Sequence, residues 1–289
     1  MNAVRISAAR MGLEVYATMT RARFARTIAT MSRRPFVGGN WKMNTDLATG
    51  VALAQAIDSR WNQSQDAVDV VLFPPFPYLQ AVGRAMSGGV VSLGAQDLSS
   101  EANGALTGEV SAEMLTDVGV TWVLVGHSER RHKLCEPNSV VADKFAMAIE
   151  SGLSVVLCVG ETQAERSAGQ ANHVVGRQLK SAFERVSPES LAKIVIAYEP
   201  VWAIGTGVVA TPHDAEEAHQ EIRGFIGSRY DPELAAGIRI VYGGSLAPGH
   251  AKTLFSVPGV DGGLVGGASL QANDFLSICS SAMIGIVAG

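Results

Sequence analysis

The chain has 289 residues, of which 47% are hydrophobic and 17% are charged. This composition can supply a sizeable core and excludes an intrinsically disordered chain, and no run of about 18 apolar residues is present to span a membrane. Three widely spaced cysteines exclude a disulfide scaffold and a CxxC motif, and they predict a reduced, cytoplasmic protein.

The net charge of −4 is unevenly distributed along the chain. Residues 1–34 contain seven arginines and a single acid, Glu14, so the rest of the chain carries 16 basic and 26 acidic residues. That acidic body argues against binding to a nucleic-acid backbone. The basic segment resembles a transit peptide in composition. We favour a dispensable, poorly ordered extension upstream of a start at Met31, with residues 35–289 forming one catalytic domain.

From Pro35 onward, short apolar runs alternate with longer segments that have helix signals. The runs are nearly continuous in hydrophobicity, as expected for parallel strands covered on the outside. The eight predicted strands are Phe36–Trp41, Val68–Phe73, Val90–Ala95, Trp122–Gly126, Val155–Gly160, Ile194–Tyr198, Ile238–Tyr242 and Gly263–Val265.

The segments between these strands contain helix caps. Helix starts are predicted at Ser111, at Asn138 and at Thr211, the last of which is followed by a proline. Helix ends are predicted at Gly119 and Gly152. Eight strand–helix units over about 250 residues favour a closed (β/α)8 barrel in a single domain. An open doubly wound sheet would have the same alternation of strands and helices. The number of strand–helix units and the total length are what favour a closed barrel.

In such a barrel, functional side chains gather at the carboxyl ends of the strands. Polar residues follow the predicted strands at these positions, and two glycine-rich turns follow the last two strands. The candidates are Asn40, Lys42, His127, Ser128, Glu129, Glu199, Gly243–Ser245 and Gly266–Gly267.

His127 and Glu199 are the strongest candidates for chemistry. A single histidine is more often structural than catalytic, but Ser128 and Glu129 look like the start of a helix, whose N–H groups would disfavour an imidazolium. Glu199 follows an apolar strand and precedes Pro200, so a partly dehydrated carboxylate suited to general base catalysis is expected there. Both residues are expected at the same end of the predicted barrel. This shared position supports a catalytic site more strongly than either residue does alone.

Two further motifs do not fit their usual context. Gly205–Ala210 matches the G-x-G-x-x-A dinucleotide fingerprint, but the strand ends about six residues earlier and the helix starts only at Thr211. Gly243–Ala247 lacks the final glycine of a serine-hydrolase nucleophile elbow. His213 and His219, six residues apart, lie on different helix faces, so we expect no metal site.

Several segments resemble the signature blocks of the triosephosphate isomerase family. They are residues 39–44 (GNWKMN), 103–110 (NGALTGEV), 126–131 (GHSERR), 197–207 (AYEPVWAIGTG), 242–245 (YGGS) and 264–270 (LVGGASL). The similarity runs from about Pro35 to the C-terminus. It implies a TIM barrel that interconverts dihydroxyacetone phosphate and D-glyceraldehyde 3-phosphate without a cofactor or a metal.

The resemblance also implies residue roles, which are carried over from the family. Glu199 would be the base and His127, neutral, the electrophile. Lys42 and Asn40 would stabilise the oxyanion and bind substrate, with support from Ser128 and Glu129. The implied phosphate-binding residues are Gly205, Ser245, Gly266 and Gly267.

The family also implies a lid and a dimer. Residues 200–207 would form the lid, with hinges at Pro200, Gly205 and Gly207 and an exposed apolar tip that includes Trp202. Homodimerisation would insert the loop around residues 103–109 beside the partner's site. Leu106 and residues 134–137 depart from the family pattern, and both departures bear on subunit contacts.

Two alternatives remain at this point. One is another phosphate-binding barrel enzyme, such as a sugar-phosphate aldolase or an indole-forming synthase. A Schiff-base aldolase needs a nucleophilic lysine deep in a strand, whereas Lys42 lies just past the end of a predicted strand and Lys193 precedes one. The other is a barrel retained as a non-catalytic scaffold, which the presence of the carboxylate, imidazole and lysine together disfavours.

Overall fold

The computed structural model describes residues 33–61, 67–86, 89–205 and 208–284. Its eight strands form a closed barrel in the order β1 to β8, and every neighbouring pair is parallel. The predicted (β/α)8 fold is confirmed, and each predicted strand agrees with the observed one to within one residue at either end. The strands are β1 Phe36–Asn40, β2 Asp69–Phe73, β3 Val91–Ala95, β4 Trp122–Val125, β5 Ser154–Val159, β6 Ile194–Tyr198, β7 Arg239–Tyr242 and β8 Gly262–Val265.

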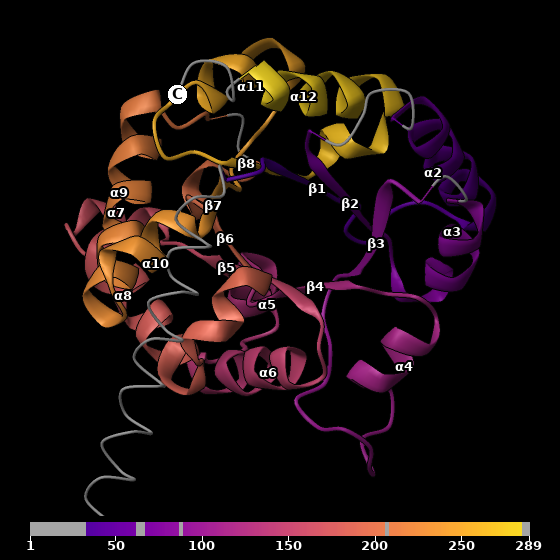
Figure 1. Ribbon diagram of the computed structural model, residues 1–289, viewed down its shortest axis with the longest axis horizontal. Coiled ribbons are helices and arrows are strands. Elements are labelled where there is room, and N and C mark those ends of the chain that lie inside the picture. The colour runs from indigo at the N-terminus through magenta and orange to yellow at the C-terminus, as the bar shows by residue number, and fades with distance from the viewer. Residues whose placement is uncertain (1–32, 62–66, 87–88, 206–207, 285–289) are drawn as a thin grey trace, which may run out of the picture.

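Helices surround this barrel on all sides (Figure 1). The α-helices are α2 Leu47–Trp61, α3 Leu79–Ala85, α4 Ala112–Asp117, α5 Ser128–Lys133, α6 Asn138–Glu150, α7 Gln163–Ser167, α8 Ala171–Ala182, α9 Pro212–Arg229, α10 Pro232–Gly237, α11 Pro248–Phe255 and α12 Ala272–Ile284. Five short 3₁₀ helices complete the set: η1 Phe76–Tyr78, η2 Phe183–Arg185, η3 Pro188–Lys193, η4 Val201–Ala203 and η5 Gly267–Leu270.

The strands are buried on both faces, which explains their continuous hydrophobicity. On β2, Val71 and Phe73 belong to the cluster that fills the barrel, whereas Val70 and Leu72 belong to the larger cluster between the barrel and the helices. The barrel interior is tightly packed, because a Cβ built on Gly94 would lie 2.3 Å from the Phe73 ring. The barrel is therefore a rigid support for the loops at its ends.

Most predicted caps are present. The Ser111 hydroxyl accepts a hydrogen bond from the Met114 N–H, and Thr211 forms a capping box with Asp214 at the start of α9. Gly119 and Gly152 take left-handed φ values of 87° and 84° just beyond α4 and α6.

The cap predicted at Asn138 is wrong. Pro137 is the N-cap of α6, and Asn138 is already the first helical residue. The Asn138 Oδ1 accepts a hydrogen bond from Nη1 of Arg131 instead, at 2.7 Å. An arginine from the preceding helix therefore occupies the oxygen that would have capped α6.

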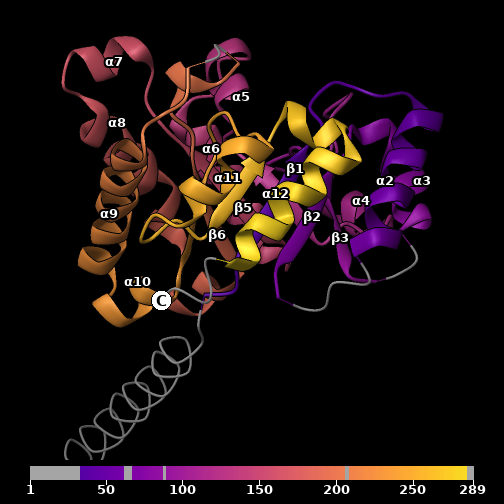
Figure 2. The ribbon, with the colours of Figure 1, turned by 90° about the horizontal axis from the view of Figure 1, so that it is seen from above.

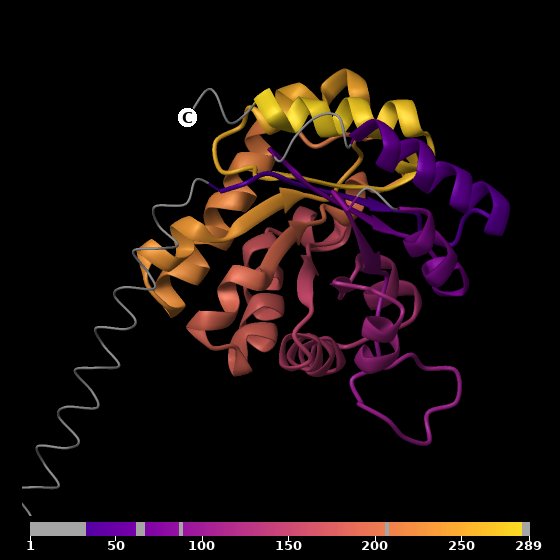
Figure 3. The same cartoon turned by 45° about the vertical axis from the view of Figure 1, so that its right-hand side comes forward.

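The two ends of the barrel differ in what surrounds them. α5 and α7, which follow strands, lie at one end, and α10, which precedes β7, lies at the other (Figure 2). The segment between β3 and α4 projects as a long loop away from the body (Figure 3).

Of the predicted basic extension, residues 1–34, the structure describes Arg33 and Arg34, and the remainder lies outside the described residues. Arg33 Nε donates to Asp261 Oδ1 at 2.7 Å, and Arg34 Nε lies 2.9 Å from Asp69 Oδ1. These two arginines are thus bonded to the barrel.

Candidate active site

A pocket of about 280 Å³ lies at the carboxyl ends of the strands. It is of a size for a small molecule rather than a polymer. Ten of the candidate residues from the sequence line it: Asn40, Lys42, His127, Glu199, Gly205, Gly243, Gly244, Ser245, Gly266 and Gly267. Its other lining residues are Ile204, Leu246, Leu264 and Ala268. Ser128 and Glu129 lie behind this lining and contact it.

The Glu199 carboxylate is buried just beyond the end of β6, with 1% of the residue exposed. Its Oε2 accepts a hydrogen bond of 2.8 Å from the Ser128 N–H in the first turn of α5. Its Oε1 lies 3.0 Å from Nε2 of His127 but outside hydrogen-bond alignment, so Oε1 has no hydrogen bond among the described residues. One carboxylate oxygen is therefore hydrogen-bonded and the other is buried without a hydrogen bond.

Two glycines allow Glu199 to occupy this position. A Cβ on Gly160 would lie 1.7 Å from the Glu199 carbonyl oxygen, and a Cβ on Gly243 would lie 2.9 Å from the Glu199 Cγ. The backbone is fixed by the Glu199 N–H, which donates to the Val159 carbonyl at 2.7 Å. Close backbone approach, which only glycine permits, thus sets where the carboxylate lies.

His127 is the N-cap residue of α5. Its Nδ1 accepts a hydrogen bond of 3.2 Å from the Glu129 N–H. An accepting ring nitrogen carries no proton, so this contact favours the tautomer with its proton on Nε2, the nitrogen that faces Glu199. The start of α5 therefore orients the ring.

Lys42 lies on the β1 side of the same pocket. Its backbone has a left-handed φ of 54°, a conformation that is strained in a residue with a side chain. The Lys42 N–H donates to Oδ1 of the buried Asn40 at 3.0 Å, and the Lys42 Nζ donates to Glu129 Oε1 at 3.1 Å. Gln96 Nε2 donates to the Lys42 carbonyl at 2.7 Å.

Glu129 is the counter-ion of this lysine. Burial acts to raise the pKa of the Glu129 carboxyl, but the positive charge of Lys42, the hydrogen bond from Lys42 and the charge of Lys133 hold that pKa below its usual value. The carboxylate therefore stays ionised and keeps the Lys42 ammonium directed at the pocket.

The opposite wall of the pocket consists of glycine turns after β7 and β8. Gly244 has no room for a side chain, because a Cβ there would lie 2.1 Å from the Tyr242 hydroxyl oxygen. Gly267 begins η5, the short helix after β8. Exposed backbone N–H groups of such turns suit an anion.

Residues Val201–Gly205, which we call the wall segment, follow β6 and close one side of the pocket. Ile204 and Gly205 line the pocket, and the Ala203 carbonyl accepts a hydrogen bond of 2.7 Å from the Ser245 hydroxyl. Trp202 is not the exposed tip that the sequence suggested. It is half-buried, and its indole Nε1 donates to Glu161 Oε1 at 2.8 Å. The predicted hinge Gly207 lies outside the described residues.

Sequence reasoning overlooked Glu161, which is fully buried directly after β5. It also overlooked Gly160 and Gln96, and it singled out Gly243 as part of a glycine-rich turn but not as a close neighbour of Glu199. Glu161 follows a predicted strand just as Glu199 does. Without a visible partner for its charge, however, nothing in the local sequence distinguished it from a solvated carboxylate.

Within the described residues, no group of three or more His, Cys, Asp or Glu side chains is arranged to hold a metal ion. None of the helices in the same part of the chain is long and apolar enough to cross a membrane.

Comparison with known proteins gives a consistent result. A family model described as triosephosphate isomerase matches residues 35–282. The triosephosphate isomerase of Hahella chejuensis is 47% identical over 251 residues, which cover 87% of this chain and 99% of that protein. That of Chromohalobacter salexigens is 48% identical over 250 residues, covering 86% and 99%, and that of Herminiimonas arsenicoxydans is 46% identical over 250 residues, covering 86% and 100%.

Proposed function

Because the chain belongs to the triosephosphate isomerase family and interconverts dihydroxyacetone phosphate and D-glyceraldehyde 3-phosphate, we propose that the pocket described above is its active site, with Glu199 as the base and His127 as the electrophile. The observation that carries this proposal is the 3.0 Å approach of Glu199 Oε1 to His127 Nε2 at the wall of a pocket that Lys42 also lines.

The reaction begins with removal of a proton from the carbon next to the substrate carbonyl. Glu199 Oε1 takes this proton, since Oε2 is held by Ser128. The Nε2–H of His127 donates to the carbonyl oxygen as negative charge develops on it, and the proton then passes between the two enediolate oxygens. Glu199 returns its proton to the neighbouring carbon, which completes the isomerisation.

Both kinds of group are needed because carbon acids are weak. General acid–base catalysis contributes about 10²–10⁴ in rate, and one preorganised donor to an oxyanion contributes roughly 3–4 kcal/mol. Lys42 and Asn40 supply further positive potential and hydrogen bonding at the oxyanion. Gly205, Ser245, Gly266 and Gly267 hold the phosphate group of the substrate.

We propose further that the enzyme needs no metal or cofactor, acts in the cytoplasm and forms a homodimer. Each step above uses only side chains of the chain itself. A reducing compartment fits three free cysteines, two of which are buried. The dimer is supported by apolar side chains exposed in the region of the projecting loop, among them Leu106 and Met114.

The wall segment is proposed to act as a lid over the substrate phosphate, as the sequence predicts. Lys193, one of the two lysines considered for a Schiff base, lies outside the pocket lining and donates its Nζ to the Gly152 carbonyl. This contact favours isomerisation over aldolase chemistry.

The test is the substitution Glu199→Ala in a coupled triose phosphate assay. Loss of the base is expected to lower kcat by about 10²–10⁴. Circular dichroism and the affinity for glycerol 3-phosphate, which has the phosphate but no carbonyl, should stay close to wild type. Full activity of a correctly folded Glu199→Ala variant would exclude the proposed mechanism.

A further inference from the structure

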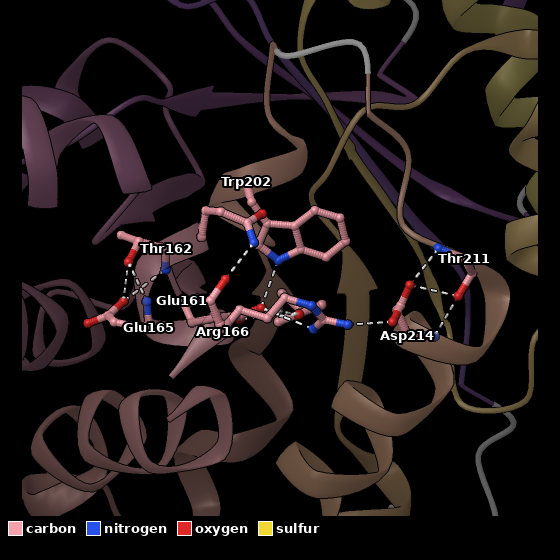
Figure 4. A network of polar contacts seen from close by, with 10 residues as sticks. Glu161, Thr162, Glu165, Arg166, Trp202, Thr211 and Asp214 are labelled. Atoms are coloured by element: carbon pink, nitrogen blue, oxygen red, sulfur yellow. Dashed lines mark hydrogen bonds and ion pairs between the residues drawn. The ribbon is translucent and has the colours of Figure 1, made fainter. Parts of the chain in front are cut away.

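The wall segment is held from outside the pocket by a polar network around Glu161 (Figure 4). The Glu161 carboxylate is fully buried and accepts hydrogen bonds from the Tyr198 hydroxyl at 3.1 Å and from the Trp202 indole at 2.8 Å. Its backbone carbonyl accepts from the Val201 N–H at 3.0 Å. The beginning of the wall segment is therefore attached to the end of β5.

The cation in this network is Arg166 of α7. A capping box between Thr162 and Glu165 starts α7 and fixes the turn on which Arg166 lies. The Arg166 guanidinium carbon lies 4.7 Å from the centre of the Trp202 ring, and its Nη1 lies 3.4 Å from Glu161 Oε1. Arg166 thus contacts both members of the Glu161–Trp202 hydrogen bond.

The same guanidinium also reaches the start of α9. Its Nη2 donates to Oδ1 of Asp214, whose other oxygen accepts from the Thr211 N–H at 2.9 Å and the Thr211 hydroxyl at 2.7 Å. Thr211 is the residue at which the chain leaves the pocket and enters α9. Arg166 therefore connects Trp202 in the wall segment to the start of α9.

The charges in this network are mutually satisfied. Burial acts to lower the pKa of Arg166, but Asp214, Tyr198 and Glu161 raise it overall. Burial acts to raise the pKa of Asp214, but Thr211 and Arg166 hold it low. Removing Arg166 would leave the Glu161 carboxylate buried with only neutral donors.

We propose that Arg166 is a positioning residue for catalysis: it sets the wall segment against the substrate by clamping Trp202 and the start of α9. The inference rests on the proposed active site, because displacement of the wall segment would change how the substrate phosphate is enclosed. A displaced wall segment would admit water and leave the enediolate free to expel its phosphate group. That elimination breaks the carbon–oxygen bond to phosphate and yields inorganic phosphate and, after tautomerisation, methylglyoxal.

The planar fork of an arginine is required for this role. Arg166 stacks on an indole face and directs two different nitrogens at two carboxylates, whereas a lysine ammonium is a single point charge. An Arg166→Lys variant therefore keeps the charge but loses the simultaneous contacts.

The surroundings of Arg166 make a direct test possible. A cavity of about 710 Å³ between α8 and α9 is lined by Arg166, Glu161 and Asp214. It is separate from the substrate pocket, whose lining includes none of these three residues. A small cation can therefore enter the place of a truncated Arg166 without competing with substrate.

The experiment compares wild type, Arg166→Ala and Arg166→Lys, with Arg185→Ala as the matched control, because Arg185 forms an exposed ion pair with Asp143. For each protein, kcat, KM and the inorganic phosphate released per isomerisation are measured with and without millimolar guanidinium, and with urea as an uncharged control. We expect Arg166→Ala to lower kcat/KM about tenfold and to raise phosphate release. Guanidinium should reverse both effects, and urea should reverse neither.

The outcomes separate the possibilities. An unchanged ratio of phosphate to isomerised product in folded Arg166→Ala, or equal rates for Arg166→Lys and wild type, would overturn the proposal. If Arg166→Ala does not fold, Arg166→Lys provides the test, because it should still release more phosphate per isomerisation than the wild type. An error in the proposed active site would give a different result, because a variant without Glu199 would then keep its isomerase activity.

Discussion

At the scale of single residues, the site depends on glycines as much as on its polar groups. Glu199 lies where it does because Gly160 and Gly243 leave room beside it. The Nδ1 of His127 accepts a hydrogen bond from the Glu129 N–H, which orients the ring. The chemistry of both groups is therefore set by backbone neighbours that carry no reactive atom.

The prediction at this scale is that Gly243→Ala lowers kcat by at least about tenfold, because the new methyl would lie 2.9 Å from the Glu199 Cγ and displace the carboxylate. Steady-state kinetics, together with a thermal melt, measures the effect. The control is Gly249→Ala in α11, whose Cβ would meet nothing within 4 Å. Equal kcat values for the two variants would show that Gly243 does not position Glu199.

The polar residues of the pocket could be predicted because they end predicted strands and match family motifs. Glu161 and Arg166 could not be predicted, since their importance comes from contacts with residues far along the chain. Glu161 contacts Trp202 across 41 positions, and Arg166 contacts Asp214 across 48. Such pairings follow from closure of the barrel and not from any local pattern.

At the scale of elements, α9 contains a buried histidine that makes stability depend on pH. His219 is fully buried, and its Nδ1 lies 2.6 Å from the Ala215 carbonyl oxygen. Burial lowers its pKa to about 4. Because this pKa is below that of the unfolded chain, the stabilisation is complete above pH 6.5 and is lost as the pH falls toward 4.

We therefore predict that the wild type loses about 3 kcal/mol relative to His219→Phe between pH 7 and pH 4. Urea unfolding at several pH values measures this difference. Asp97 acts in the opposite direction, since burial raises its pKa to about 6, but it is common to both proteins and cancels. Parallel pH profiles would show that His219 is not the group responsible.

Strand positions were predictable because the runs are buried on both faces and all but β2, which ends before Pro74, are bounded by a polar residue or a glycine. The helix starts were predictable where a side chain caps its own helix, as at Ser111 and Thr211. The prediction failed at Asn138, where Arg131 competes for the capping oxygen. A local capping signal is therefore reliable only when no other side chain bonds to the capping oxygen.

At the scale of the whole molecule, the loop between β3 and α4 is the feature that projects from the barrel. Leu106 in that loop is 45% exposed, and Met43 beyond β1 is 96% exposed. We propose that the surface around Leu106 is an interface with another protein. In the proposed homodimer, a second copy of the chain covers it.

We predict that Leu106→Glu converts the dimer into monomers, because a carboxylate would be buried in an apolar interface. Sedimentation velocity measures the assembly state, and Ser187→Glu, an exposed position between η2 and η3, is the control. A wild-type protein that is monomeric, or a Leu106→Glu variant that remains dimeric, would contradict the proposed interface.

The central claim is that Glu199 removes a proton from carbon within the pocket it shares with His127. The most direct measurement is deuterium incorporation into dihydroxyacetone phosphate in D₂O, followed by NMR for wild type and Glu199→Gln. We expect rapid exchange by the wild type and exchange slowed by about 10² or more in the variant. Exchange at the wild-type rate in a folded Glu199→Gln protein would contradict it.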